Sequence, residues 1–227
     1  MQEANATPLR IGFNKDPWSW LTHFGGFIAA IVGAVFLMVQ TTDVPLKQAT
    51  MALYGATLVL MFATSSTYHF LDLGVEGNRW LRRADHCAIF LLIAGSSLPA
   101  AVHLLDGGWR IVTITTLGVM ATAGIIFKLL WLEAPRWVTI SIYIGMAWGA
   151  LVPGFRMFPQ LDAESLTWLF GGGAAYTFGA LIYATKRPDP FPGVFGFHEV
   201  WHVFVLVGAA CHYFFALQFC DAPCVPF

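Results

Sequence analysis

The sequence predicts an all-α integral membrane protein built as a bundle of seven transmembrane helices. Its 227 residues are 57% hydrophobic and only 11% charged, whereas about 25% of the residues of a soluble domain are charged. Apolar runs recur along the chain at the length of roughly 20 residues that a helix needs to cross a bilayer. Helices are expected throughout, because irregular or strand backbone exposed to lipid would leave polar groups unpaired.

Seven segments have the length and apolar character of spanning helices. We expect them at roughly 18–40, 47–71, 84–105, 110–132, 136–153, 165–185 and 197–219. Breakers or charges close the first six: Asp43 and Pro45, then the stretches GVEGNRWLRR, DGGWR, EAPR, PGFR and KRPDPFPG. Because the connections are short, consecutive helices should run antiparallel and pack as one domain over residues 1–227.

The distribution of Lys and Arg predicts the orientation in the membrane. One side would hold nine of these residues and the other three: Arg10, Lys15, Arg79, Arg82, Arg83, Lys128, Arg136, Lys186 and Arg187 against Lys47, Arg110 and Arg156. Cytoplasmic loops carry the excess of positive charge. We therefore expect a multi-pass protein of the cell's inner (plasma) membrane, with the N-terminus in the cytoplasm and the C-terminus outside. Cys220 and Cys224 would face the oxidising side, where a disulfide and two free cysteines are equally open.

Composition also limits the partners. The first sixteen residues are polar and mixed, so no removable signal peptide is expected. The formal net charge of −1 argues against a nucleic-acid partner.

Five polar residues fall at one depth of the predicted bundle. Helix 2 ends with Ser65 and His69, helix 3 begins near Asp85, and helix 7 begins with His198 and His202. The predicted topology places all five near the inner face. Ionisable residues inside membrane segments are rare and usually functional.

These residue types at this spacing predict a zinc site. His198 and His202 are four apart and share a helix face, which suits two imidazoles on one metal. With His69 they supply three neutral imidazoles, as in catalytic zinc sites that keep a fourth position open. Asp85 could hold the water or act as general base. Ser65 could orient a ligand or a substrate carbonyl, although serines in membrane helices more often bond to their own helix.

Three further histidines have weaker assignments. His23, near the inner end of helix 1, is a reserve ligand or an outer-shell group. His86 points about 100° away from Asp85 and suits the interface. His212, ten residues beyond His202, is expected to be a buried, hydrogen-bonded histidine.

The segment from His198 to His202 also matches the H-E-x-x-H signature of zinc proteases, in which Glu is the general base. Intramembrane metalloproteases carry this motif early and take an acidic third ligand from a later helix. Here the motif lies in the last helix, and the third candidate ligand is an upstream histidine. A protease is therefore the least favoured interpretation, and Glu199 is not the expected base.

The ordered motifs resemble the bacterial hemolysin III proteins, a group within the progesterone and adipoQ receptor superfamily that includes the adiponectin receptors. The resemblance rests on S-x3-H at 65–69, Asp85 in R-R-x-D-H-x-A-I-F-L-L-I-A-G, and H-x3-H at 198–202, followed by Gly208 and Cys211-His212. It implies seven helices, a cytoplasmic N-terminus and zinc held by three histidines, here His69, His198 and His202. Asp85 and Ser65 would line that site.

Two stretches depart from the pattern of this superfamily. Its usual E-x-x-N is Asp16-Pro17-Trp18-Ser19 here, and its G-T-Y-x-P is Gly95-Ser96-Ser97-Leu98-Pro99. Neither stretch is expected to touch the five site residues, so the zinc inference stands and only the shape of the substrate pocket is put in question.

The wider superfamily, which includes alkaline ceramidases, implies hydrolysis of lipid amides. The sequence thus predicts a zinc-dependent, ceramidase-like hydrolase whose partner is a membrane lipid with an acyl chain. The alternative is a non-enzymatic receptor or membrane-perturbing protein in which zinc only fixes the helices. An open fourth coordination position favours the enzyme, because structural zinc is normally closed by four protein ligands.

Overall fold

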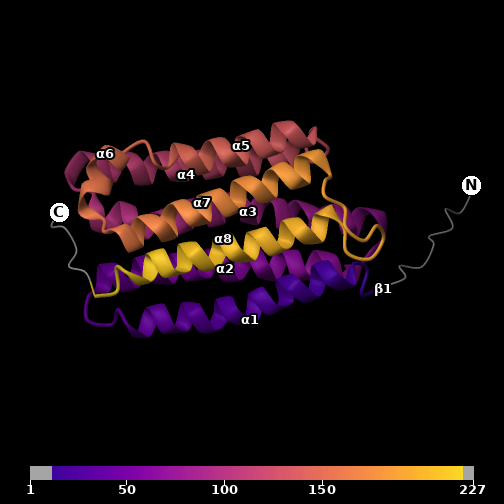
Figure 1. Ribbon diagram of the computed structural model, residues 1–227, viewed down its shortest axis with the longest axis horizontal. Coiled ribbons are helices and arrows are strands. Elements are labelled where there is room, and N and C mark those ends of the chain that lie inside the picture. Colours follow the sequence, from indigo (N-terminus) through magenta and orange to yellow (C-terminus); the bar gives the residue numbers. More distant parts are fainter. Residues whose placement is uncertain (1–11, 222–227) are drawn as a thin grey trace, which may run out of the picture.

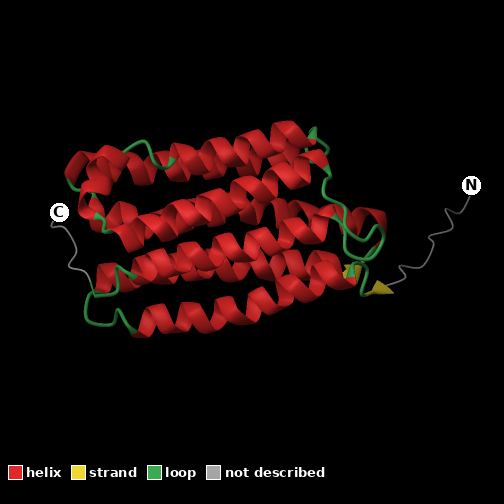
Figure 2. Ribbon diagram, viewed as in Figure 1, coloured by secondary structure: helices red, strands yellow, loops and turns green. Residues whose placement is uncertain are grey.

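The computed structural model describes residues 12–221 as a bundle of long helices that run alongside one another (Figures 1 and 2). The all-α class is confirmed, since the only strands among the described residues are two of two residues each. The elements in chain order are β1 (Gly12–Phe13), α1 (Pro17–Val39), α2 (Pro45–Phe70), β2 (Leu71–Asp72), α3 (Gly74–Leu104), α4 (Gly107–Leu130), α5 (Arg136–Gly149), α6 (Gly154–Met157), η1 (Phe158–Gln160), α7 (Ala163–Thr185) and α8 (Phe197–Leu217).

The helices have the properties of an integral membrane protein. Six helical segments are long and apolar enough to cross a bilayer: α1, α2, α3, α4, the stretch Arg136–Gln160, and α8. Large apolar side chains also face outward, including Val32, Ile111 and Phe178 at 65%, 66% and 60% exposure. A surface with so many exposed apolar side chains is suited to lipid rather than to water.

The segment predicted as the sixth span, α7, is not among those six. It has 23 residues, but the glycine run 171–173 and several polar or aromatic residues make it less apolar than its neighbours. It packs against α5 and α8 and lies within the bundle (Figure 1). Small residues of this kind let helices approach closely in membranes.

The third helix begins ten residues earlier than the sequence analysis predicted, at Gly74 rather than at residue 84. The charged stretch GVEGNRWLRR was expected to be a loop, because its polarity ends the apolar run. It forms the first turns of α3 instead. An ion pair of 3.2 Å between Arg79 and Glu76 joins two of its turns, and Gly74 adopts a φ of +72° where the chain turns into the helix. Polarity marks the edge of the bilayer, not the end of a helix.

The fifth predicted helix, 136–153, is shorter than expected and ends at Gly149. Residues 150–153 form turns before the short α6. Pro153 accounts for the early end, because a proline disfavours helical backbone in the residue before it.

A small strand pair that the sequence analysis did not predict joins the N-terminal segment to the end of α2. Strands β1 and β2 are antiparallel, with Gly12 opposite Asp72 and Phe13 opposite Leu71. The backbone N–H of Asp16 donates to the carbonyl oxygen of His69 at 2.9 Å. This pairing holds the start of α1 beside the last turn of α2.

The largest hydrophobic core lies between α1, α2, α3 and α8, with fully buried members that include Leu37, Met51 and Tyr54. Helix α8 contacts α7, α1 and α3. Its first turns meet the end of α2, where His198 lies beside His69. Cys220 is buried at 7% exposure. Cys224, and Arg10 of the charge distribution, lie outside the described residues.

Candidate metal centre

Three histidines from two distant segments meet at one end of the bundle. His69 lies in the last turn of α2, and His198 and His202 lie in the first two turns of α8. One candidate ligand atom from each residue lies within 4.8 Å of the other two. His69 and His202 are 3% and 2% exposed, and His198 is half-buried. Their spacing in the sequence and the predicted topology indicate the same convergence.

The geometry of the three rings suits a zinc ion. The Nε2 atoms of His69 and His198 lie 3.3 Å apart. Two nitrogen ligands about 2.0–2.1 Å from a tetrahedral zinc are separated by nearly that distance. Their imidazole donors are also the type that zinc prefers. The donor set and its spacing therefore fit zinc, with no fourth His, Cys, Asp or Glu in the group among the described residues.

A carboxylate orients the first of these histidines. Oδ2 of Asp16 lies 2.9 Å from Nδ1 of His69, opposite the Nε2 that faces His198. This hydrogen bond fixes which ring nitrogen carries the proton, as carboxylates do for many metal-binding histidines. The bond to His69 is also the main cause that lowers the pKa of the Asp16 carboxyl below its usual value.

The first turn of α1 supports the third histidine in a similar way. Nδ1 of His202 lies 3.3 Å from the backbone oxygen of Ser19 and 3.5 Å from the hydroxyl of Thr22. His23 stacks on the His202 ring with centroids 3.6 Å apart. His202 is therefore held on one edge and one face, with Nε2 left for the metal.

Ser65 and His23 form a buried pair beside the three histidines. The Ser65 hydroxyl lies 2.7 Å from Nδ1 of His23. His23 is not part of the three-histidine group, so the structure gives it an outer position rather than that of a reserve ligand. Both residues line the cavity described below.

Asp85 lines the same cavity from α3. Its Oδ2 lies 3.4 Å from Nδ1 of His86, so His86 is turned toward Asp85 and not out to the interface as the sequence analysis expected. The peptide oxygen of His86 accepts a hydrogen bond of 2.9 Å from Tyr143. Asp85 thus lines the same cavity as His198 and His202 without belonging to the three-histidine group.

Glu199, the acidic residue of the H-E-x-x-H match, is outside the three-histidine group and bonds to other residues. Its Oε2 accepts from the backbone N–H of Gly196 at 2.8 Å and its Oε1 from the Ser19 hydroxyl at 2.7 Å. The first contact is half of a capping box that starts α8. In these contacts Glu199 caps the start of α8.

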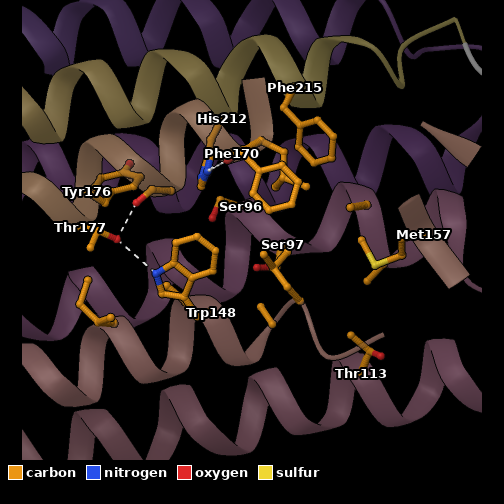
Figure 3. Close-up of a pocket in the computed structure, with 18 residues that line it drawn as sticks. Ser96, Ser97, Thr113, Trp148, Met157, Phe170, Tyr176, Thr177, His212 and Phe215 are labelled. Atoms are coloured by element: carbon orange, nitrogen blue, oxygen red, sulfur yellow. Dashed lines mark hydrogen bonds between the residues drawn. The ribbon is translucent and has the colours of Figure 1, made fainter. Parts of the chain in front are cut away.

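A cavity of about 150 Å³ is lined by two of the three histidines, His198 and His202. Asp85 and Ser65 also line it, while much of the wall is apolar. A smaller hollow of about 70 Å³ adjoins it and shares Ser96, Ser97, Ile144, Ala147, Tyr176 and His212. Figure 3 shows this second hollow.

The departure at Gly95-Ser96-Ser97-Leu98-Pro99 therefore lies in the cavity wall, as the sequence analysis supposed. His212 is hydrogen-bonded there, with Nε2 3.3 Å from the carbonyl oxygen of Leu169 (Figure 3). This matches the expectation of a hydrogen-bonded histidine.

The Asp16–Ser19 stretch was not expected to touch the site residues, and this expectation is wrong, because Asp16 contacts His69 and the backbone oxygen of Ser19 contacts His202. The sequence pattern thus missed Asp16. Its contact with His69 depends on the β1–β2 pairing, which two-residue strands do not reveal in a sequence. The one available signal was an acidic residue directly before a membrane helix.

Comparison with known proteins places the chain in a family. The model of the haemolysin-III related family matches residues 11–213. The chain belongs to this family. It is 26% identical to the hemolysin-3 homolog of Bacillus subtilis, over 88% of this chain and 92% of the relative. It is 29% identical to hemolysin-3 of Bacillus cereus, over 87% of this chain and 88% of the relative.

A eukaryotic member is also similar. The adiponectin receptor protein of Drosophila melanogaster is 26% identical over 85% of this chain, which corresponds to 48% of that protein. The resemblance inferred from the motifs is therefore confirmed at the level of the family.

Asp16 provides a test of the metal centre that does not depend on catalysis. Asp16→Asn should lower zinc affinity by roughly 10–100-fold, as loss of an outer-shell carboxylate typically does. A chelator competition titration measures this affinity. Asp72→Asn is the matched control, because Asp72 lies in β2 and its side chain accepts from Gly74 and Asn78 at the start of α3. Equal affinity in Asp16→Asn and wild type would remove Asp16 from the site.

Proposed function

We propose that this protein is a zinc-dependent hydrolase that cleaves an amide bond in a membrane lipid. The observation that carries the proposal is the three-histidine cluster, whose ligand atoms lie within 4.8 Å of one another, beside a cavity with a largely apolar wall. Such a cavity suits an acyl chain, and its polar residues suit the bond that is cut.

His69, His198 and His202 would hold the zinc. When bound, zinc supplies Lewis acidity toward a carbonyl oxygen and lowers the pKa of water. Because no fourth described protein group joins the three histidines, the arrangement favours a catalytic over a structural site.

Asp85 would act as the general base. It would accept a proton from the water that attacks the amide carbon and return it to the amine that leaves. Its position on the wall of the cavity that His198 and His202 also line supports this role. Ser65 would donate a hydrogen bond to the carbonyl oxygen, and its contact with His23 would hold the hydroxyl in place.

The membrane topology belongs to the same proposal. We infer seven spans, with α7 as the sixth, in the plasma membrane, and the metal centre near the cytoplasmic face. The excess of Lys and Arg at that end supports this orientation. Labelling of single cysteines introduced at Arg82 and Asp221 tests it, since both residues should not react from the same side.

The second candidate function is a receptor or membrane-perturbing protein in which zinc is structural. The names of two relatives, hemolysin-3 and adiponectin receptor protein, favour it. The cavity and the carboxylate on its wall favour the hydrolase, because a purely structural metal requires neither.

An assay with a panel of N-acyl lipids separates these two functions. Zinc-loaded protein in detergent should release fatty acid from at least one ceramide or N-acyl phospholipid, and zinc-stripped protein should not. Release would be followed by mass spectrometry. If zinc-loaded protein releases no fatty acid from any lipid of the panel, the hydrolase proposal is wrong and the receptor function takes its place.

A further inference from the structure

Arg136, at the start of α5, lies on the same face of that helix as the residues that line the cavity. Thr139, Ile140 and Tyr143 line the cavity from α5, and Arg136, the first residue of that helix, lies three, four and seven positions before them. Residues at this spacing share one helix face. Helix α5 begins at the end of the bundle where α7 ends and α8 begins (Figure 1). Arg136 therefore lies at the rim of the cavity.

Aromatic rings hold the Arg136 guanidinium in place. Its central carbon lies 5.0 Å from the ring centre of Tyr183 and 5.4 Å from that of Phe197. Tyr183 in turn contacts the His198 ring, with centroids 5.6 Å apart. One aromatic ring thus separates the arginine from a candidate zinc ligand.

One nitrogen of this guanidinium has no hydrogen-bond acceptor among the described residues. Nη1 of Arg136 is buried and has no hydrogen-bond partner among residues 12–221. In the same part of the chain, no carboxylate lies within 4.0 Å of Arg136. Buried polar groups are nearly always satisfied in native proteins. The acceptor that Arg136 lacks among the described residues is therefore expected to come from a ligand.

A second cation lies beside this rim. Nζ of Lys128 is buried and donates a hydrogen bond of 2.8 Å to Oγ1 of Thr139, which lines the cavity. The nearby Glu133 is paired with Arg82 at 3.1 Å, and Asp85 lies against His86. Lys128 is thus a buried cation behind the cavity wall, held by Thr139 and by the Leu132 carbonyl oxygen at 3.4 Å. The described residues show no ion pair for it or for Arg136.

Phosphate is the anion that fits this rim. A guanidinium binds phosphate oxygens through a planar fork of N–H donors, and Arg is the preferred residue for such contacts. In N-acylated lipids with a phosphorylated head group, the phosphate ester is commonly two carbons from the amide nitrogen. A lipid of this kind could place its phosphate at Arg136 while its amide lies near His198 and its acyl chain enters the apolar cavity.

We propose that Arg136, with Lys128 behind the cavity wall, forms a binding site for the phosphate of an N-acylated membrane lipid. The proposed phosphate contact depends only on the residues at the rim and not on the hydrolase function. The assignment of this lipid as substrate rests on the proposed hydrolase function.

Binding to zinc-stripped protein tests the site without hydrolysis. The probes are ceramide 1-phosphate and ceramide with the same acyl chain, and dissociation constants are measured with full-length protein in detergent. Wild type should bind the phosphorylated lipid roughly tenfold or more tightly, the size expected for a charge-assisted hydrogen bond. Arg136→Gln should lose that preference, and Arg136→Lys should keep part of it, because lysine retains the charge without the fork.

Arg79→Gln is the matched control for general surface charge. Arg79 also precedes the buried part of its helix but is paired with Glu76. This variant should keep the preference of wild type, and its thermal unfolding and that of Arg136→Gln should match wild type. Equal loss in both variants, or an unchanged preference in Arg136→Gln, would overturn the site.

Inorganic phosphate separates a lipid head group from a free anion. At millimolar concentration it should displace ceramide 1-phosphate only weakly, because it lacks the acyl chain. Displacement as effective as that by the lipid itself would show a free-phosphate site and contradict the proposal. A phosphate preference in a protein that hydrolyses nothing would leave the site intact and remove only the hydrolase function.

Discussion

Replacing His202 with alanine should abolish high-affinity zinc binding. His202 is 2% exposed, and its Nδ1 is placed 3.3 Å from the Ser19 carbonyl oxygen, so its Nε2 is free to bind metal beside His69 and His198. With one of three protein ligands gone, the site would retain two imidazoles, fewer than the three protein ligands of a catalytic zinc site.

Metal analysis of the purified proteins measures this effect. Wild type should contain about one zinc per chain, and His202→Ala close to none. His212→Ala is the matched control, because His212 lies on the same helix, contacts the Leu169 carbonyl and is outside the cluster. It should retain zinc. Full zinc content in His202→Ala would contradict the assignment of the ligands.

The same site should contribute to stability. Its ligands come from α2 and α8, so bound zinc would link the two helices and favour the folded state. A ligand present at 1,000 times its dissociation constant stabilises a protein by about 4 kcal/mol. Chelation should therefore lower the thermal unfolding temperature of wild type and leave that of His202→Ala unchanged.

Replacing Asp85 with asparagine should remove hydrolysis while zinc remains bound. Asparagine has nearly the same size but cannot accept the proton of the attacking water at neutral pH. Loss of a general base typically slows a reaction by roughly 10²–10⁴-fold. Because Asp85 lies outside the three-histidine group, the zinc content should match that of wild type.

Fatty acid release from the best lipid of the panel measures the effect of Asp85→Asn. Glu199→Gln serves as control, because both oxygens of Glu199 are engaged in contacts with Ser19 and Gly196. It should retain hydrolysis. Loss in Glu199→Gln with activity in Asp85→Asn would transfer the role of base to the H-E-x-x-H motif.

The fold could be predicted from the sequence where lipid imposes the pattern. Apolar runs of spanning length identified each long helix, because a bilayer demands that length and composition. The same criterion placed the start of α3 at residue 84, whereas the helix begins at Gly74. Polar residues in the sequence indicate where the lipid ends. Whether a helix continues past that point depends on local contacts such as that between Glu76 and Arg79.

In the candidate site, only the three histidines that could bind the metal were predictable from the sequence. The i, i+4 spacing brought His198 beside His202, and topology placed His69 level with them. The residues around these histidines are placed by contacts across the bundle, and such contacts leave no periodic pattern in the sequence. Asp16 reaches His69 because two short strands pair. Arg136 was counted only for orientation, and its rim position became visible only once α5, α7 and α8 were placed together.

The most direct test of the metal centre is zinc K-edge X-ray absorption on purified wild-type protein. The site described here predicts a four-coordinate zinc with three imidazole nitrogens and one further oxygen, at about 2.0–2.1 Å, and no sulfur. A sulfur ligand at about 2.3 Å, a shell with fewer than three imidazoles, or protein without zinc would contradict the three-histidine centre.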